Sequence, residues 1–278
     1  MSNMTRSAPL EPAPARLGAL YLVPTPLDFG CGDEAWAPIE QTLPAGTLTV
    51  ASRLGHWVTE NAKSTRAFLK RVNAHTLLQH TLQTLDIQEL PRELHKKGDF
   101  GAGNGANVNV DKLLGPALAG HDMGLVSEAG MPAVADPGAL VVRAAHQAGV
   151  PVCVLSGPSS LLMALASSGL NGQSFAFVGY LPQHTTERVV RIRDLESLVH
   201  RTGQTQLFIE TPYRNEGLMD SLLSSLKPST RLAVACGLAL ADGPHHSGPR
   251  VFSGTPGEWQ AKRRQLNWAW PCVYMIGI

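Results

Sequence analysis

Charged side chains are scarce in this sequence of 278 residues, because Asp, Glu, Lys and Arg make up only 16% of it. Together with the 44% hydrophobic content, this excludes a disordered polyelectrolyte and a long solvated coiled coil. The 23 basic and 22 acidic side chains nearly cancel, so no net field selects nucleic acid or a membrane as partner. We expect a globular protein of two domains, since a single core seldom grows past ~250 residues.

Cysteines are few and widely spaced, and Cys31, Cys153, Cys236 and Cys272 form no C-x-x-C pair. This spacing argues against a zinc finger and against a disulfide-stapled secreted scaffold. The last three lie in apolar runs, which predicts buried free thiols and a reducing cytoplasm. Residues 1–17 lack an apolar signal core, and no stretch reaches the ~18 apolar residues of a membrane span. We expect a disordered lead-in and no membrane partner.

Several common active-site motifs are also absent. The sequence has no G-x-x-x-x-G-K-[ST] phosphate loop, no G-x-S-x-G nucleophile elbow and no H-E-x-x-H metal helix. The glycine-rich run 101–105 follows polar residues instead of a strand, which favours a flexible loop over a dinucleotide fingerprint. His245 and His246 lie in a Gly/Pro-rich run without further ligands, which favours an exposed loop. We expect no resident metal.

Apolar runs and turn residues alternate along the chain in a regular series. In the first half the pattern predicts strands at 19–23, 47–51, 123–127 and 151–155, and helices at 60–72, 74–85, 138–147 and 161–168. In the second half it predicts strands at 175–178, 206–210, 231–236, near 251 and at 272–278, and helices at 186–200 and 213–226. Such alternation implies an α/β fold whose ligands bind beyond the carboxyl ends of the parallel strands.

This series divides into two α/β domains. We place an N-terminal domain at 18–157 and a C-terminal domain at 158–278, with the border just before or within the helix predicted at 161–168. No flexible linker separates them, so close packing is expected.

Polar residues gather in loops at the predicted strand ends. Glu128 and Asp136 flank small residues whose backbone stays open to a nucleoside-sized ligand. Glu128 directly follows a strand and is the better binding candidate, whereas Asp136 beside Pro137 and Gly138 favours a structural turn. The run 156–160 offers a helix N-terminus with unpaired amides and two hydroxyls.

Another polar cluster closes the strand predicted at 206–210. In the run 210–214, Glu210, Tyr213 and Arg214 bring a carboxylate, a phenol and a guanidinium to one sheet edge. The alternative is a capped helix start with Pro212 in its first turn and an ordinary surface ion pair. Two basic groups form either local patches for RNA or merely solvated helix faces: Arg188, Arg191 and Arg193, and Lys262, Arg263 and Arg264.

Five ordered motifs span about 70% of the chain, from Leu20 to Asn215. They are LYLVPTPL (20–27), VSEAGMPAVADPG (126–138), VLSGPSS (154–160), ALASSGLNGQSFAFVGYLP (164–182) and FIETPYRN (208–215). In this order they resemble the tetrapyrrole-methylase-type, class III S-adenosylmethionine-dependent methyltransferases, in the branch of the small-subunit rRNA cytidine 2′-O-methyltransferases. The resemblance implies a two-domain fold with a parallel-sheet N-terminal domain and a mixed-sheet C-terminal domain. It also implies a homodimer that binds S-adenosylmethionine between the domains.

The resemblance assigns the cofactor to the same strand-end loops. By motif position, the implied cofactor-binding residues are Pro24, Thr25, Ser127, Glu128, Ala129, Gly130, Met131, Ala133, Ala135, Gly157, Pro158, Ser159, Ser160, Thr211, Pro212 and Tyr213.

The leading functional hypothesis is in-line methyl transfer to a nucleophile, with an rRNA ribose hydroxyl as the first acceptor to consider. A hydroxyl acceptor needs a group that manages its proton, and the candidates are Glu60, Lys63, Glu210 and Arg214. Two alternatives stay open. One is a small-molecule acceptor such as a tetrapyrrole. The other is an S-adenosylmethionine-binding protein that has lost catalysis, because the stretch ENAKSTR (60–66) lacks the aspartate of the family's Glu-Asp-Thr-Arg segment.

Overall fold

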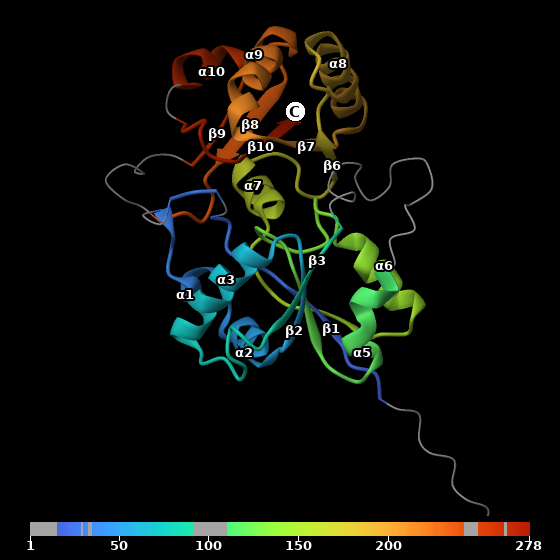
Figure 1. Cartoon of the computed structure of the whole chain (residues 1–278). Coiled ribbons are helices and arrows are strands. Elements are labelled where there is room, and N and C mark those ends of the chain that lie inside the picture. The colour runs from blue at the N-terminus through green and yellow to red at the C-terminus, as the bar shows by residue number, and fades with distance from the viewer. Residues whose placement is uncertain (1–15, 29, 33–34, 92–109, 242–249, 264–265) are drawn as a thin grey trace, which may run out of the picture.

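The computed structural model describes residues 16–28, 30–32, 35–91, 110–241, 250–263 and 266–278, which form two lobes (Figure 1). Several predictions fall outside these ranges: residues 1–15 of the lead-in, the glycine-rich run and most of the 91–110 loop, His245, His246 and Arg264.

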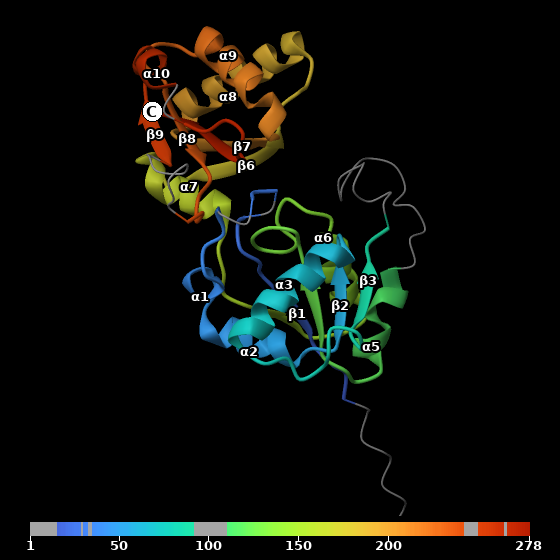
Figure 2. The same ribbon diagram turned by 60° about the vertical axis from the view of Figure 1, so that its left-hand side comes forward.

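The N-terminal lobe is built on a parallel sheet. Its described strands are β1 (Leu20–Val23), β2 (His56–Thr59), β3 (Asp86–Glu89), β4 (Met123–Val126) and β5 (Val152–Val154). They lie in the order β3-β2-β4-β1-β5, and every neighbouring pair is parallel. The central strands β1 and β4 are short apolar runs, as expected where both faces of a parallel sheet are covered. The carboxyl ends of the strands face the other lobe (Figure 2).

Helices cover both faces of this sheet (Figure 1). One face carries α1 (Ile39–Thr42), α2 (Ala45–Arg53) and α3 (Ala62–His75); the other carries the 3-10 helix η2 (Val110–Leu114), α5 (Gly115–Leu118) and α6 (Ala139–Gln147). The start of α3 is set by Asn61, whose side-chain oxygen accepts from the backbone N of Lys63 at 2.8 Å and of Ser64 at 3.4 Å. An asparagine N-cap of this kind fixes where the helix begins.

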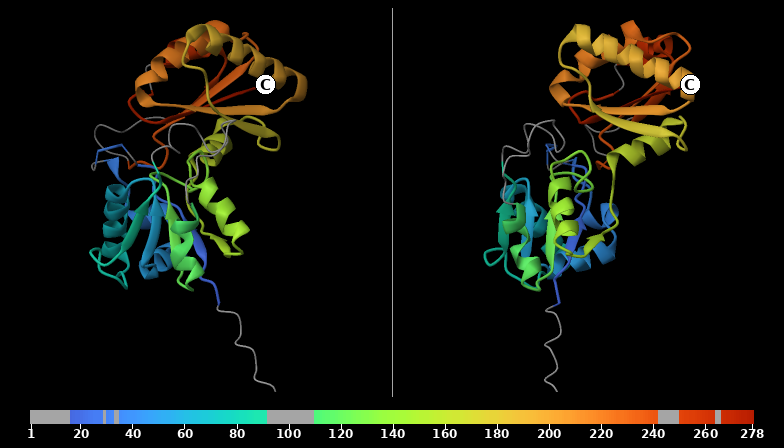
Figure 3. Two further views of the ribbon diagram at one scale, coloured as in Figure 1. Left: turned by 45° about the vertical axis from the view of Figure 1, so that its right-hand side comes forward. Right: turned by 90° about the vertical axis from the view of Figure 1, so that its right-hand side faces the viewer.

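The C-terminal lobe is built on a mixed sheet. Its described strands are β6 (Phe175–Tyr180), β7 (Thr205–Glu210), β8 (Arg231–Cys236), β9 (Val251–Gly254) and β10 (Cys272–Gly277), in the order β6-β7-β10-β8-β9. The β6–β7 pair is parallel and the other pairs are antiparallel. One face packs against α8 (Thr185–Thr202), α9 (Asn215–Ser225) and α10 (Pro256–Lys262), and the other packs against α7 (Ser160–Ser168). Helix α7 therefore lies between this sheet and the N-terminal lobe (Figures 1 and 3).

The predicted fold class is confirmed, with a parallel sheet followed by a mixed sheet. The chain passes from the first sheet to the second between β5 and α7, and we retain the division at residues 157 and 158 as a proposal. Within the described ranges, no helix is long and apolar enough to cross a membrane.

The strand predicted at 47–51 is wrong, because these residues lie in α2. Thr47, Thr49 and Val50 are residue types that are common in strands. However, Leu48 and Ala51 lie three positions apart on one helical face and are fully buried in the core. Burial of that face against the sheet outweighs the weak β propensity of the threonines.

The helix predicted at 74–85 is also wrong. Helix α3 ends at His75, because Thr76 takes an extended backbone and the side-chain oxygen of Asn73 accepts from the N of Leu78 at 3.0 Å. Leu77, which the prediction placed on an apolar face, is 80% exposed. The chain instead continues into β3, an edge strand of the described sheet that the sequence did not indicate.

The free-thiol prediction fails for one pair of cysteines. Cys236 ends β8 and Cys272 begins β10, directly opposite each other in the antiparallel register. They form a disulfide with their Cα atoms 4.4 Å apart, and both are buried as expected. Sheet register brings these residues together across 36 positions, so spacing alone could not show it. The argument from free thiols to a reducing compartment therefore no longer holds.

The two predicted basic groups are only partly exposed. Arg188 is buried in α8 and its Nε donates to Ser221 Oγ at 2.9 Å. Arg263 makes an ion pair with Asp220 at 2.5 Å. Arg191 and Arg193 are exposed on α8.

Candidate functional site

Two loops leave the carboxyl ends of β1 and β4 and are tied together by a short bridge. The N of Thr25 donates to the carbonyl of Gly130 at 3.0 Å, and the N of Gly130 donates back to the carbonyl of Thr25 at 3.1 Å. The Thr25 hydroxyl also donates to the Ser127 carbonyl at 3.3 Å. These hydrogen bonds join two loops distant in sequence into one wall above the sheet.

Two predicted glycines are required by this packing. Gly130 has a φ of +74°, and a Cβ there would lie 3.0 Å from Leu27 Cδ2. A Cβ at Gly157 would lie 2.2 Å from Pro24 Cγ, so that loop approaches the β1 loop too closely for any side chain. Gly130 therefore serves a left-handed turn, and Gly157 serves close contact between the β1 and β5 loops.

A cavity of about 340 Å³ lies between the two lobes, and we call it the interdomain cavity. The β1 and β4 loops contribute Leu27 and Ala129, and α7 contributes Ser160. The C-terminal lobe contributes Tyr180, Ile209, Glu210, Thr211, Pro212, Ala235, Gly237, Leu238, Pro271, Cys272 and Val273. The lining is mostly apolar with a few polar groups, which is typical of small-molecule sites.

Glu210 is the charged group of this cavity. Its side chain is 1% exposed, and its Oε1 accepts from the N of Thr211 at 2.8 Å and from Arg214 Nε and Nη2 at 2.9 and 2.5 Å. Its Oε2 is buried and receives no hydrogen bond from the described residues. A buried carboxylate oxygen without a donor is costly, so it is suited to a ligand that brings an N–H or O–H group.

Tyr180 stands at the edge of the same cavity. The residue is 56% exposed. Partial burial of the hydroxyl raises its pKa, and the negative charge of Glu210 raises it further. The phenol therefore stays protonated and can donate a hydrogen bond.

A smaller hollow of about 50 Å³ adjoins the interdomain cavity, with Ala129, Ser160 and Ile209 lining both. Its remaining lining residues are Gly130, Met131, Val134, Ala135, Ser159 and Leu161. The two spaces together gather many predicted residues: Ala129, Gly130, Met131, Ala135, Ser159, Ser160, Glu210, Thr211 and Pro212.

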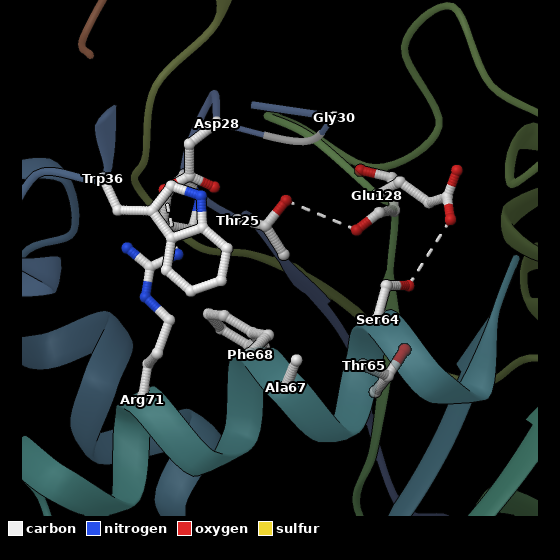
Figure 4. A pocket seen from close by; sticks show the side chains of 12 residues that line it. Thr25, Asp28, Gly30, Trp36, Ser64, Thr65, Ala67, Phe68, Arg71 and Glu128 are labelled. Atoms are coloured by element: carbon white, nitrogen blue, oxygen red, sulfur yellow. Dashed lines mark hydrogen bonds and ion pairs between the residues drawn. The ribbon is translucent and has the colours of Figure 1, made fainter. Parts of the chain in front are cut away.

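A second site lies on the other side of the loop wall. We call it the β1–α3 pocket; its volume is about 110 Å³ (Figure 4). It is lined by Thr25, Pro26, Asp28, Gly30, Trp36, Ser64, Thr65, Ala67, Phe68, Arg71, Ser127 and Glu128. Ser64, Phe68 and Arg71 rise from α3 toward the loops (Figure 4).

Charged groups sit at both ends of this pocket. At one end, Arg71 pairs with Asp28 at 2.9 Å and lies 4.7 Å from the centre of the Trp36 ring. At the other, Ser64 Oγ donates to Glu128 Oε1 at 3.5 Å, and the N of Glu128 donates to Glu60 Oε1 at 3.3 Å. Carboxylates, a hydroxyl and an aromatic wall thus face one small space.

The remaining predicted residues line neither cavity. Tyr213 is 83% exposed, Arg214 holds Glu210, and Lys63 is exposed on α3. Pro24, Gly157 and Pro158 pack in the β1 and β5 loops. Ala133 lies in the turn that Asp136 organises, because Asp136 Oδ1 accepts from the N of Ala133 at 2.9 Å and of Gly138 at 2.7 Å. The predicted structural role of Asp136 is confirmed. In the described part of the chain, no three or more His, Cys, Asp and Glu side chains cluster as a metal site.

Comparison with known proteins places the chain among methylases. The family model described as Tetrapyrrole (Corrin/Porphyrin) Methylases matches residues 58–243. The Ribosomal RNA small subunit methyltransferase I of Vibrio cholerae is 32% identical over 204 residues, which cover 73% of this chain and 59% of that protein. The protein of the same name from Xylella fastidiosa is 40% identical over 126 residues, covering 45% of this chain and 44% of its own length. The chain thus spans less than two thirds of these relatives.

A solved structure has the same fold at low identity. The uroporphyrin III C-methyltransferase of Thermus thermophilus superposes with a TM-score of 0.51 and 17% identity, over 94% of this chain and 97% of that one. Because the family model covers more than half of the sequence, the chain belongs to the tetrapyrrole (corrin/porphyrin) methylase family.

Proposed function

We propose that this protein is an S-adenosylmethionine-dependent methyltransferase that holds the methyl donor in the interdomain cavity. The observation that carries the proposal is the buried Oε2 of Glu210, which lines a cavity between the lobes and receives no hydrogen bond from the described residues. S-adenosylmethionine offers ammonium, amino and hydroxyl donors to such an oxygen. Membership of the methylase family supports the same ligand.

We place the methyl acceptor in the β1–α3 pocket, because the loops that line this pocket also line the interdomain cavity. Along the β1 loop, Leu27 lines the interdomain cavity and its neighbour Asp28 lines the pocket. Along the β4 loop, Ala129 lines the cavity and its neighbour Glu128 lines the pocket. Donor and acceptor would thus be held by the same two loops. In-line transfer needs the methyl carbon and the acceptor oxygen about 3 to 3.5 Å apart, so the two ligands would have to meet at the edge of this wall.

When bound, S-adenosylmethionine supplies a methyl group on a positively charged sulfur. The acceptor oxygen would form a bond to that carbon while the carbon–sulfur bond breaks. The electron pair of the broken bond would stay on sulfur. The hydroxyl proton must then pass to a base. Glu128 lines the pocket and its backbone N donates to Glu60 Oε1, so these two carboxylates are the bases that we propose. Arg214 instead pairs with Glu210 at the cavity, and Lys63 is exposed on α3.

An rRNA ribose hydroxyl is the acceptor we put first. Two relatives are named for methylation of ribosomal RNA, and a ribosomal substrate would place the protein in the cytoplasm. The test supplies labelled S-adenosylmethionine to extracts with and without the gene and follows label into RNA and into small molecules. Label in rRNA supports the proposal. Label in tetrapyrroles favours the alternative acceptor, and donor binding without transfer to any pool indicates lost catalysis.

We also propose a homodimer. β5 and β6 are edge strands of their described sheets, and the segment from β5 to β6 exposes Val154 at 66%, Leu162 at 56% and Phe175 at 41%. Unpaired edges with apolar side chains favour association with a second chain. Light scattering should report about twice the 29.7 kDa of one chain. A single-chain mass at micromolar concentration would argue against the dimer.

A further inference from the structure

Helix α3 carries a basic face beside the β1–α3 pocket. Lys63, Arg66 and Lys70 are exposed and lie three and four positions apart, so they follow one side of the helix. The helix AKSTRAFLKRVNAH contains no acidic residue. Lys63 and Lys70 are two turns apart, about 10 Å along the axis. This face presents a row of positive charges to solvent.

The pocket adjoins this row on the same helix. Ala67, which lines the pocket, lies between Arg66 and Lys70 along the helix and is itself exposed. Across the pocket lies Trp36, a partly exposed residue whose buried Nε1 donates to none of the described residues and whose ring has the Arg71 guanidinium 4.7 Å from its centre. An aromatic wall next to a row of cations is the combination that single-stranded nucleic acids bind, since bases stack while phosphates meet Lys and Arg.

We propose that the basic face of α3 and the β1–α3 pocket together bind a single-stranded RNA segment. Its phosphates lie along Lys63, Arg66 and Lys70, and one base enters the pocket against Trp36. The inference rests on the proposed function, because it names the surface that presents the acceptor. It assigns Lys63 to phosphate contact instead of proton transfer.

The other basic groups are weaker candidates for this surface. Arg188 is buried, which leaves Arg191 and Arg193 as the exposed members of its group; Arg263 pairs with Asp220, and Lys262 lies over the Phe252 ring. On α3 the neighbouring Glu89 is engaged at the helix start, where its Oε1 accepts from the N of Ala62 at 2.8 Å. The carboxylates of an acidic protein could pair with the same cations but would not stack in an aromatic pocket. RNA has phosphates for the cations and bases for the pocket, so it fits both features.

The phosphate contacts are tested by the salt dependence of binding. A labelled single-stranded RNA of mixed sequence is titrated by fluorescence anisotropy at several salt concentrations, with wild type and the Arg66→Gln/Lys70→Gln variant. Loss of two phosphate contacts on a single strand should lower the slope of log K against log salt by about 1.4, or about 25-fold in affinity at 0.1 M salt. The matched control is Arg191→Gln/Arg193→Gln on α8, which should match wild type. Equal loss in both variants, or none in the first, overturns the proposal.

The base contact is tested with an abasic strand of the same length. Wild type should bind the intact RNA about tenfold more tightly than the abasic strand, because stacking on an aromatic side chain adds to phosphate binding. Trp36→Leu should remove this preference without changing affinity for the abasic strand, and Trp36→Phe should restore most of it. Equal affinities of wild type for both strands would remove the pocket from the proposal, even if Trp36→Leu failed to fold.

Two controls separate this inference from the donor site. S-adenosylmethionine should still raise the melting temperature of Arg66→Gln/Lys70→Gln as it does for wild type. Absence of that shift in wild type contradicts the proposed function and leaves the RNA titration interpretable. Equal affinity of wild type for polyglutamate and for RNA would identify a general anion surface and overturn RNA as the partner.

Discussion

Replacing Glu210 by glutamine tests the interdomain cavity most directly. The change keeps the shape of the side chain, but it removes the charge that pairs with Arg214 and puts an NH₂ group where a carboxylate oxygen stood. If the amide oxygen keeps the hydrogen bonds of Oε1 to Thr211 and Arg214, the NH₂ takes the place of Oε2. A ligand N–H group would then meet a donor instead of an acceptor.

The expected magnitude follows from hydrogen bonds to charged groups, which contribute about 1.5 to 3 kcal/mol. Loss of one such bond to S-adenosylmethionine raises Kd by about 10- to 150-fold, since ~1.4 kcal/mol is tenfold. The free energy of unfolding should fall on the same scale, because the ion pair with Arg214 is largely buried. Isothermal calorimetry measures the first quantity and denaturant titration the second.

Glu196→Gln is the matched control. Glu196 is also a buried glutamate of the C-terminal lobe, at 3% exposure, and its Oε1 accepts from the N of Lys227 at 2.7 Å and from Thr230 Oγ1 at 2.5 Å. It lies on α8, away from the lining of the cavity. It should lose stability similarly without changing Kd. A Kd for Glu210→Gln within twofold of wild type, in a folded variant, would refute the role of Oε2.

Four further outcomes are expected. Gly130→Val should abolish donor binding or lower stability, because φ is +74° and Leu27 lies 3.0 Å from the new Cβ; unchanged calorimetric affinity in a folded protein would contradict this. Asp136→Asn should lower the melting temperature while donor affinity stays within twofold, since Oδ1 holds the turn at Gly138. Glu128→Gln should reduce methyl transfer more than donor binding, and equal effects on both would place it with the donor. Removing divalent metal with a chelator should leave the donor-induced shift in melting temperature unaltered.

The sequence predicts the strands of this fold well where burial is complete. Continuous apolar runs such as those of β4 and β10 leave little alternative, because both faces of these strands are covered. Prediction fails in α2, because its residues support two different structures. The spacing of Leu48 and Ala51 fits a helix, whereas its threonines are residues that are common in strands. Prediction also fails at β3, whose residues are half exposed and gain their order only by pairing with β2.

The site residues also fall into two groups, those that the sequence indicates and those that it does not. Residues that follow predicted strands directly, such as Glu128 and Glu210, could be found because strand ends mark the ligand edge of an α/β sheet. Val273 and Cys272 could not, because β10 inserts between β7 and β8 and brings the C-terminal strand to the cavity. Trp36 and its partner Arg71 meet only in the folded chain, so no local pattern indicates the pocket they share.

The β1 and β4 loops line both the interdomain cavity and the β1–α3 pocket, so they affect the positions of the proposed donor and acceptor together. Asp28 and Glu128 face the pocket, and their chain neighbours Leu27 and Ala129 face the cavity. A rotation of either loop would therefore displace a residue in both spaces at once. The bridge between Thr25 and Gly130 joins the two loops through paired backbone hydrogen bonds, which oppose such a rotation. In-line transfer depends on the relative position of the two ligands, so this bridge would contribute to their alignment. Its backbone groups would do so without taking part in the chemistry.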